Sequence, residues 1–213
     1  MNTYLNTLAE RITALANEQS AVETAAALLT EAQTNNRLIH VFGTEPATAS
    51  LMTEVFFRAG ALTNINPILD PSLDPAHGAY RNEMCMQLEG LSPCILDYYE
   101  YVEAGEPMLL MGTDPAAPMF AEALAWAKNK GLKTIAFVCR GCDCDADVVL
   151  HHGALQDSLG GEQSVLLCAL LHAVNDKAAA SLDDSHVWHG THTVDLSANA
   201  ARIDERLFRI RHL

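Results

Sequence analysis

The chain alternates between short apolar runs and longer segments in which apolar residues recur every three or four positions. One apolar run, residues 37–42, stops at Gly43-Thr44-Glu45-Pro46-Ala47, and a second, residues 107–111, stops at Gly112-Thr113-Asp114-Pro115-Ala116. Each pattern predicts a buried strand, a tight glycine turn and a helix that begins at a proline. Ligands of α/β proteins often bind at such junctions, because free backbone N–H groups and the helix dipole converge there.

The rest of the chain continues this alternation. Strands and helices in alternation predict one domain, residues 1–213, with a doubly wound, mostly parallel sheet flanked by helices. It begins with an N-terminal helical segment (1–34) and ends with a tail and helix (181–213). The pattern further predicts helices over 46–59, 115–130, 162–180 and 203–210, strands over 62–69, 133–138 and 148–150, and a short helical or irregular piece over 77–89.

The N-terminal helical segment is long for a helix that covers one face of a sheet. Its apolar stripe predicts either packing against a second subunit, and hence a homodimer or higher oligomer, or a simple covering role within one chain. No apolar run reaches the length of a membrane span. The first residues also lack the basic start and apolar stretch of a signal peptide, so a cytoplasmic protein is expected.

Charge and cysteine content narrow the possible partners. The net charge of −14 argues against nucleic acid, which requires a basic surface. The six cysteines are scattered in a chain of cytosolic character, so structural disulfides are not expected.

Three stretches carry a family resemblance: Arg37–Thr44, Glu54–Gly60 and Asn64–Leu69. Together with Leu88-Glu89-Gly90, they resemble an uncharacterised branch of the SIS (sugar isomerase) domain proteins. The resemblance implies the fold described above and a cleft that binds a sugar derivative, usually a sugar phosphate, with residues from a second subunit.

The loops that hold phosphate in that family are altered in this chain. In the first, Pro46 and Ala47 stand where the family has His-Ser; in the second, Thr113 is the only hydroxyl; in the third, Ser164 keeps one. Phosphate binding is therefore an open question. By position in these loops, the predicted ligand-binding residues are Gly43, Thr44, Glu45, Gly112, Thr113, Asp114, Gln163 and Ser164.

The two junction carboxylates allow two interpretations. Asp114 before Pro115 is typical of a helix N-cap, and Glu45 before Pro46 fits the same role less well. Either carboxylate would also occupy the place of a phosphate and repel a dianion by several kcal/mol at an effective dielectric constant of ~20 or below. An amine, a polyol or a metal ion would then be the favoured ligand.

Three residues are the candidates for catalysis. Aldose–ketose isomerisation needs a base that moves a proton between adjacent carbons, and Glu89 and Glu54 are the predicted carboxylates. His77 is a candidate acid or base for opening a sugar ring. The alternatives are an exposed carboxylate or a partner of Arg58 or Arg81 for the glutamates, and a loop histidine without a role for His77.

Two further clusters have residue types that bind metals. Cys139, Cys142 and Cys144 have a spacing that could hold zinc, with free thiols in a loop as the alternative. A second cluster, His186, His189 and His192, lies in a segment with loop composition. No metal site and no cofactor is predicted.

The leading prediction is a carbohydrate-derivative-binding protein of the SIS type and a possible sugar-phosphate isomerase, with a small-molecule sugar derivative as its partner. A non-catalytic sensor or regulatory subunit with a filled cleft is the first alternative. A metal-dependent variant that uses the cysteine or histidine clusters is the second.

Overall fold

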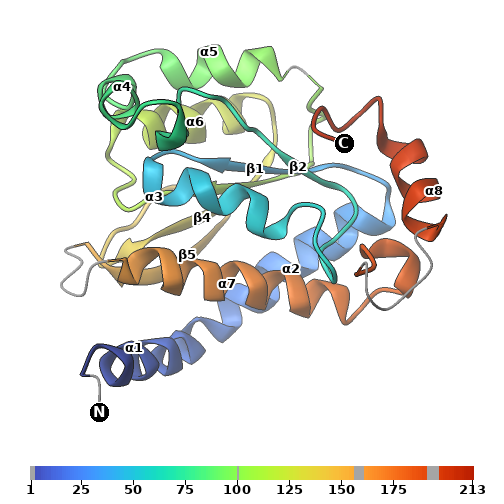
Figure 1. Cartoon of the computed structure of the whole chain (residues 1–213), viewed down its shortest axis with the longest axis horizontal. Helices are drawn as coiled ribbons and strands as arrows, with labels where there is room; N and C mark the ends of the chain where they lie inside the picture. The colour runs from blue at the N-terminus through green and yellow to red at the C-terminus, as the bar shows by residue number, and fades with distance from the viewer. Residues whose placement is uncertain (1–2, 100, 156–160, 191–196) are drawn as a thin grey trace.

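A computed structural model describes residues 3–99, 101–155, 161–190 and 197–213. It contains a five-stranded sheet whose strands are all parallel, in the order β2-β1-β3-β4-β5 (Figure 1). The sheet core is apolar, as expected for strands covered on both faces. The strands are β1 (Ile39–Gly43), β2 (Ile65–Pro67), β3 (Pro107–Met111), β4 (Lys133–Arg140) and β5 (Val148–Ala154).

Helices cover both faces of the sheet (Figure 1). On one face α5 packs on α6, which contacts β3 and β4; on the other, α2 and α7 pack on each other and on β5. The doubly wound fold is thereby confirmed. The α-helices are α1 (Thr3–Ala14), α2 (Gln19–Thr34), α3 (Pro46–Ala49), α4 (Ala79–Cys85), α5 (Leu91–Tyr98), α6 (Pro118–Asn129), α7 (Glu162–Ala179) and α8 (Ser197–Arg206); the 3-10 helices are η1 (Leu15–Glu18), η2 (Ser50–Val55), η3 (Pro75–His77) and η4 (Asp184–His186).

The N-terminal segment is helical throughout its described length. The 3-10 turn η1 separates α1 from α2. Arg11 of α1 forms an ion pair with the buried Glu162 at the start of α7, which ties the first helix to the body of the domain. None of the described helices combines the length and the apolar character required to cross a membrane.

Two predicted helices have different bounds in the structure. The helix expected over 46–59 is a single α-turn followed by η2. It ends there because Phe56 is extended and Phe57 has a φ of 50°. The helix expected to begin at Pro115 begins at Pro118. The residue before Pro118, Ala117, is extended as proline requires, so the helix cannot start earlier.

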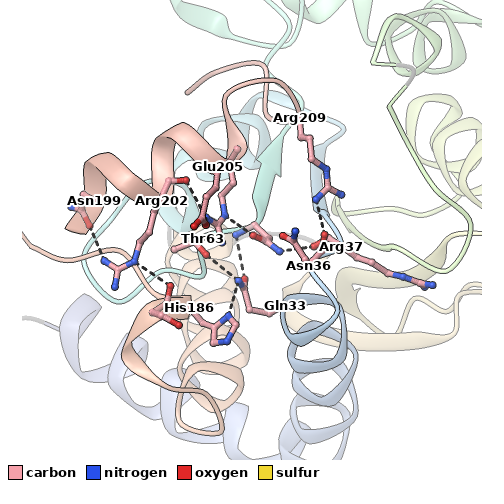
Figure 2. Close-up of polar contacts among 12 residues, drawn as sticks. Gln33, Asn36, Arg37, Thr63, His186, Asn199, Arg202, Glu205 and Arg209 are labelled. Carbon is pink, nitrogen blue, oxygen red and sulfur yellow. Dashed lines mark hydrogen bonds and ion pairs between the residues drawn. The ribbon is translucent and has the colours of Figure 1, made fainter. Parts of the chain in front are cut away.

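The C-terminal helix runs from Ser197 to Arg206, so it begins and ends earlier than the predicted 203–210. Its buried arginines attach it to neighbouring segments. Arg202 donates to the carbonyl of Asp184 (2.7 Å), and Arg206 donates to Asn64 Oδ1 (2.7 Å). After the helix, Arg209 donates to the carbonyl of Asn36 (2.6 Å), as Figure 2 shows. Asn36 and Asn64 precede β1 and β2, so this tail docks at the amino ends of the strands.

A buried ionisable pair lies at the same edge of the sheet. His40 of β1 contacts Glu106, which precedes β3, with 2.9 Å between His40 Nε2 and Glu106 Oε2. Glu106 also accepts hydrogen bonds from the backbone N–H groups of Leu38 and Glu103, both at 2.8 Å. Buried polar contacts therefore hold the amino edge of the sheet together.

Candidate functional site

The two sequence junctions lie side by side at the carboxyl ends of β1 and β3, with Gly43 paired to Met111. A Cβ on Gly43 would lie 2.6 Å from backbone atoms of the following helix, and one on Gly112 would lie 2.7 Å from the Thr44 hydroxyl. Only glycine permits these close approaches. The predicted turns are thus confirmed as tight strand–helix connections.

Hydrogen bonds join the two junctions to each other. Thr44 and Thr48 both donate their hydroxyl protons to the carbonyl of Met111, each at 3.0 Å. From the second junction, Thr113 Oγ1 donates to Glu45 Oε2 at 2.9 Å. The predicted ligand-binding residues Thr44, Glu45 and Thr113 therefore come together, but Thr113 bonds to Glu45 and Thr44 bonds to the Met111 carbonyl.

The carboxyl group of Glu45 has a raised pKa. Burial raises its pKa, the neighbouring charge of Asp114 raises it further, and the hydrogen bonds from Thr113 partly oppose this. Its Oε1 atom is buried and accepts no hydrogen bond within the described residues. An incoming phosphate would meet this carboxyl group at the place where SIS loops are expected to hold it.

Asp114 is not the N-cap of α6, which is Ala117, so that prediction is wrong. Its Oδ1 atom accepts a hydrogen bond from the N–H of Ala116 (2.9 Å), and its carbonyl accepts one from the N–H of Ala117 (3.1 Å). Residues 114–117 form a turn of their own, because Pro118, and not Pro115, occupies the first helical position.

His152 of β5 contacts the second junction. It was not among the predicted site residues. It is fully buried and contacts the carbonyl of Gly112, with 3.1 Å between Nε2 and the oxygen. Because a carbonyl only accepts, Nε2 carries the proton and Nδ1 does not. Burial lowers the pKa of His152, the Gly112 hydrogen bond opposes this, and the nearby His151 lowers it further.

We expect His152 to make stability depend on pH. Since its pKa is lower in the folded state, the unfolded chain binds the proton more tightly, so stability is complete above about pH 6.5 and falls as the pH is lowered. His152→Gln keeps an N–H donor and does not titrate, so it should flatten this dependence in chemical denaturation measured between pH 5 and 8. The wild-type protein is the reference, and an unchanged dependence in His152→Gln would contradict the assignment.

The three predicted catalytic residues do not form one cluster. Glu54 lies in a cavity between η2 and α7, whereas His77 lies in a second cavity between η2 and the segment after β2. Glu89 is exposed in the turn between α4 and α5, and Gly90, in the left-handed conformation, follows it. Of the three, Glu54 is the one with both an arginine and an imidazole beside its carboxylate.

The cavity between η2 and α7 has a volume of about 430 Å³. At its wall Glu54 forms an ion pair with Arg58, and Glu54 Oε2 lies 3.7 Å from Nε2 of His172 on α7. The Glu54 and His172 side chains are 31% and 47% exposed, so both are accessible to a ligand. A carboxylate and an imidazole that share a cavity are a possible pair of proton-transfer groups.

Cys168 completes this cluster one helical turn before His172. The ligand atoms of Glu54, Cys168 and His172 lie within 4.8 Å of one another, and all three residue types bind zinc. Arg58, however, already pairs with Glu54 and would repel a cation. Burial raises the pKa of the Cys168 thiol, Glu54 raises it further, and Arg58 opposes them, so a reactive thiolate is disfavoured.

Within the described residues, neither cluster of metal-binding residue types forms a group of metal ligands. Within the described residues, Cys139, Cys142 and Cys144 do not converge as a ligand group, and Cys139 Sγ contacts the carbonyl of Ala154 at 3.4 Å. His189 contacts Asp184 (2.7 Å between Nε2 and Oδ2). His192 lies outside the described residues.

In the third predicted loop, Gln163 connects α7 to β5. Gln163 in the first turn of α7 donates to the carbonyl of Ala154 at the end of β5, at 2.6 Å. Ser164, next to it, is partly buried. His172 and Cys168 were missed, although their spacing of four residues on a predicted helix places them on one face.

This arrangement, a parallel sheet with strand–helix junctions meeting at its carboxyl edge, defines a doubly wound α/β protein. Residues 3–139 match the family model of the SIS domain, and the chain belongs to the SIS-domain family.

Relatives and solved structures agree with this assignment. UPF0309 proteins of Brucella ovis and Brucella canis are 28% identical over 219 residues, which cover 92% of this chain and 88% of theirs. A UPF0309 protein of Geobacillus kaustophilus is 28% identical over 137 residues, 64% of this chain and 54% of that protein. The fold resembles phosphoheptose isomerases from Neisseria gonorrhoeae (TM-score 0.62, 17% identity, 84% of this chain and 95% of that one) and Francisella tularensis (TM-score 0.59, 16% identity, 84% and 96%).

Proposed function

We propose that this chain binds a sugar derivative in the cavity between η2 and α7 and isomerises it between aldose and ketose. The observation that carries the proposal is the pair Glu54 and His172, 3.7 Å apart at the wall of a 430 Å³ cavity. Membership of the SIS family and the likeness to structures titled phosphoheptose isomerases support a sugar substrate. The cavity is large enough for a monosaccharide.

The chemistry requires two proton movements. Glu54 would take the proton from C2 of an aldose and return it to C1, which passes through an enediol. His172 would move a proton between the C1 and C2 oxygens, so that carbonyl and hydroxyl exchange places and no atom is gained or lost. Arg58 would offset the negative charge that builds on these oxygens.

Water must be kept from such a site, and Glu54 and His172 are both partly exposed. We therefore propose a homodimer or higher oligomer, in which a second copy covers the cavity. The exposed apolar side chains of α1, Leu5 and Ile12, support a further surface for association. Light scattering on the purified protein tests this, and a monomer at micromolar concentration would contradict it.

The test of function is a panel of aldoses, ketoses, sugar acids and their phosphates in D₂O. An isomerase would incorporate deuterium at C2 of the aldose and at C1 of the ketose, because the proton held by Glu54 exchanges with solvent. Proton NMR measures this exchange directly, and calorimetry on the same panel measures binding. If no member exchanges or binds, the isomerase proposal fails.

A non-catalytic sensor is the second candidate, and the bridge between Glu45 and Thr113 favours it. This bridge fills the junction where the family is expected to hold phosphate. A sensor would bind a member of the panel without any deuterium exchange, so the same two measurements separate the candidates.

A further inference from the structure

A second cavity lies on the other side of η2 from the Glu54 site. It has a volume of about 400 Å³ and is formed by η2 together with the segment between β2 and η3. This volume suits a ligand the size of a monosaccharide. The apolar part of its wall includes the buried side chains of Met52 and Leu73. Its polar wall residues are Ser50, Thr53, Asp70, Asp74 and His77.

The polar wall has free acceptors but few free donors. The hydroxyls of Ser50 and Thr53 donate to carbonyls of their own helix, of Ala47 (3.4 Å) and Ser50 (3.2 Å), so lone pairs remain available on their oxygens. The nearest imidazole, His77, faces Asp74, with 3.8 Å between Nε2 and Oδ2. A ligand in this cavity would have to supply hydrogen-bond donors.

The two carboxylates reinforce this preference. Oδ1 of Asp70 accepts from the N–H and hydroxyl of Ser72, and Oδ1 of Asp74 accepts from the N–H of Ala76. Within the described residues, the second oxygen of Asp70 has no hydrogen bond, and that of Asp74 has only the distant His77. Each aspartate therefore stabilises its loop with one carboxylate oxygen, and its other oxygen is available to a ligand.

The loop that forms this wall is fixed by a residue that does not itself line the cavity. Asn82 of α4 is buried and donates to the carbonyl of Ser72 (2.6 Å), which fixes the loop between Pro71 and Leu73. Its Oδ1 atom is buried and has no partner within the part of the chain that is described. Among the described residues, His77 is the one basic residue that lines the cavity.

We propose that this cavity binds a protonated amine, carried by a small hydroxylated frame such as an amino sugar. An ammonium group supplies three donors and a positive charge, and the free oxygens of Asp70 and Asp74 would form charge-assisted hydrogen bonds with it. The apolar wall would pack against the C–H face of the frame. A phosphate or carboxylate would be repelled. The sugar frame rests on the proposed function, whereas the preference for an amine follows from this cavity alone.

Methyl NMR tests the proposal at one residue. Met52 lines this cavity and not the Glu54 cavity, so its methyl signal in protein labelled with [methyl-¹³C]methionine reports occupancy here. The signal is assigned with Met52→Leu, a substitution of nearly equal volume. The probes are glucosamine, glucose and glucose 6-phosphate. Glucosamine should shift the Met52 signal to saturation, glucose should bind about fivefold to tenfold more weakly, and glucose 6-phosphate should not shift it.

Variants distinguish binding in this cavity from binding in the Glu54 cavity. Asp74→Asn removes the charge but retains an acceptor for the Ala76 N–H, and it should weaken glucosamine about tenfold. The matched change Asp176→Asn, in the other cavity, should have no effect, and neither should Glu54→Gln. Equal affinity for glucose and glucosamine, an unchanged affinity in Asp74→Asn, or no Met52 shift would each overturn the proposal. Loss of glucosamine binding in Glu54→Gln would place the amine in the other cavity and also overturn it.

Discussion

Replacing Glu106 with alanine is expected to lower the free energy of unfolding by about 3–5 kcal/mol, because each buried donor left without its acceptor costs about 1–3 kcal/mol. Glu106 is fully buried and accepts from His40 and from the N–H groups of Leu38 and Glu103. Without it, two buried donors and the partly buried N–H of Glu103 would lose their acceptor at the edge where β1 and β3 begin. Urea denaturation followed by circular dichroism measures the loss.

The neighbouring Glu103 provides the control, because its side chain is exposed and its backbone N–H is unaffected by Glu103→Ala. That change should alter stability by less than about 0.5 kcal/mol. Burial raises the pKa of Glu106, but the hydrogen bonds from His40, Glu103 and Leu38 outweigh it, so the pKa is lowered. Its contribution is therefore complete above the unfolded value of about 4.3 and is lost as the pH falls through the lower folded value. A similar loss in both variants would contradict this account.

The strand–helix junctions could be predicted from sequence because their determinants are local. An apolar run, a glycine and a proline within about ten residues specify a buried strand, a close approach and a helix start. Gly43 and Gly112 occupy those close approaches in the structure. The parallel sheet then follows from the order of the elements.

Local sequence signals gave the wrong helix start where two prolines compete for the first helical position. Pro115 and Pro118 are both possible first residues of a helix, and the extended Ala117 selects the second. Helix α5 was not predicted because Gly90 and Pro93 look like loop residues, although proline is tolerated in a first helical turn. Such choices depend on packing against neighbours, which a local pattern does not contain.

The candidate site depends on contacts between distant segments. Glu54 was identified from its place after the first junction, but its partner His172 is on α7, and only the packing of η2 against α7 joins them. In the same way, His77 was predicted to share a site with Glu54, but the loop after β2 carries it to the other side of η2. Residue types indicated the chemistry, and tertiary structure decided which residues can act together.

Replacing Glu54 with glutamine is expected to lower kcat for the isomerised substrate by about 10²–10⁴, the range for loss of a general base, with little change in KM. Glutamine has the same shape but cannot accept the C2 proton. It can still accept a hydrogen bond from Arg58, so the cavity wall should stay intact. Deuterium incorporation at C2 should fall by the same factor as kcat, because both require the same proton transfer.

Asp176→Asn is the matched control, since Asp176 lines the same cavity but has no part in the proposed proton transfers. It should leave kcat within about twofold of the wild-type value, whereas His172→Gln should slow turnover because the proton between the two oxygens then has no carrier. His172→Gln should leave deuterium exchange less affected than Glu54→Gln does, because exchange needs only the C–H step. If Glu54→Gln keeps wild-type exchange, the base is another group, and the cavity between η2 and α7 is not where the proton is moved.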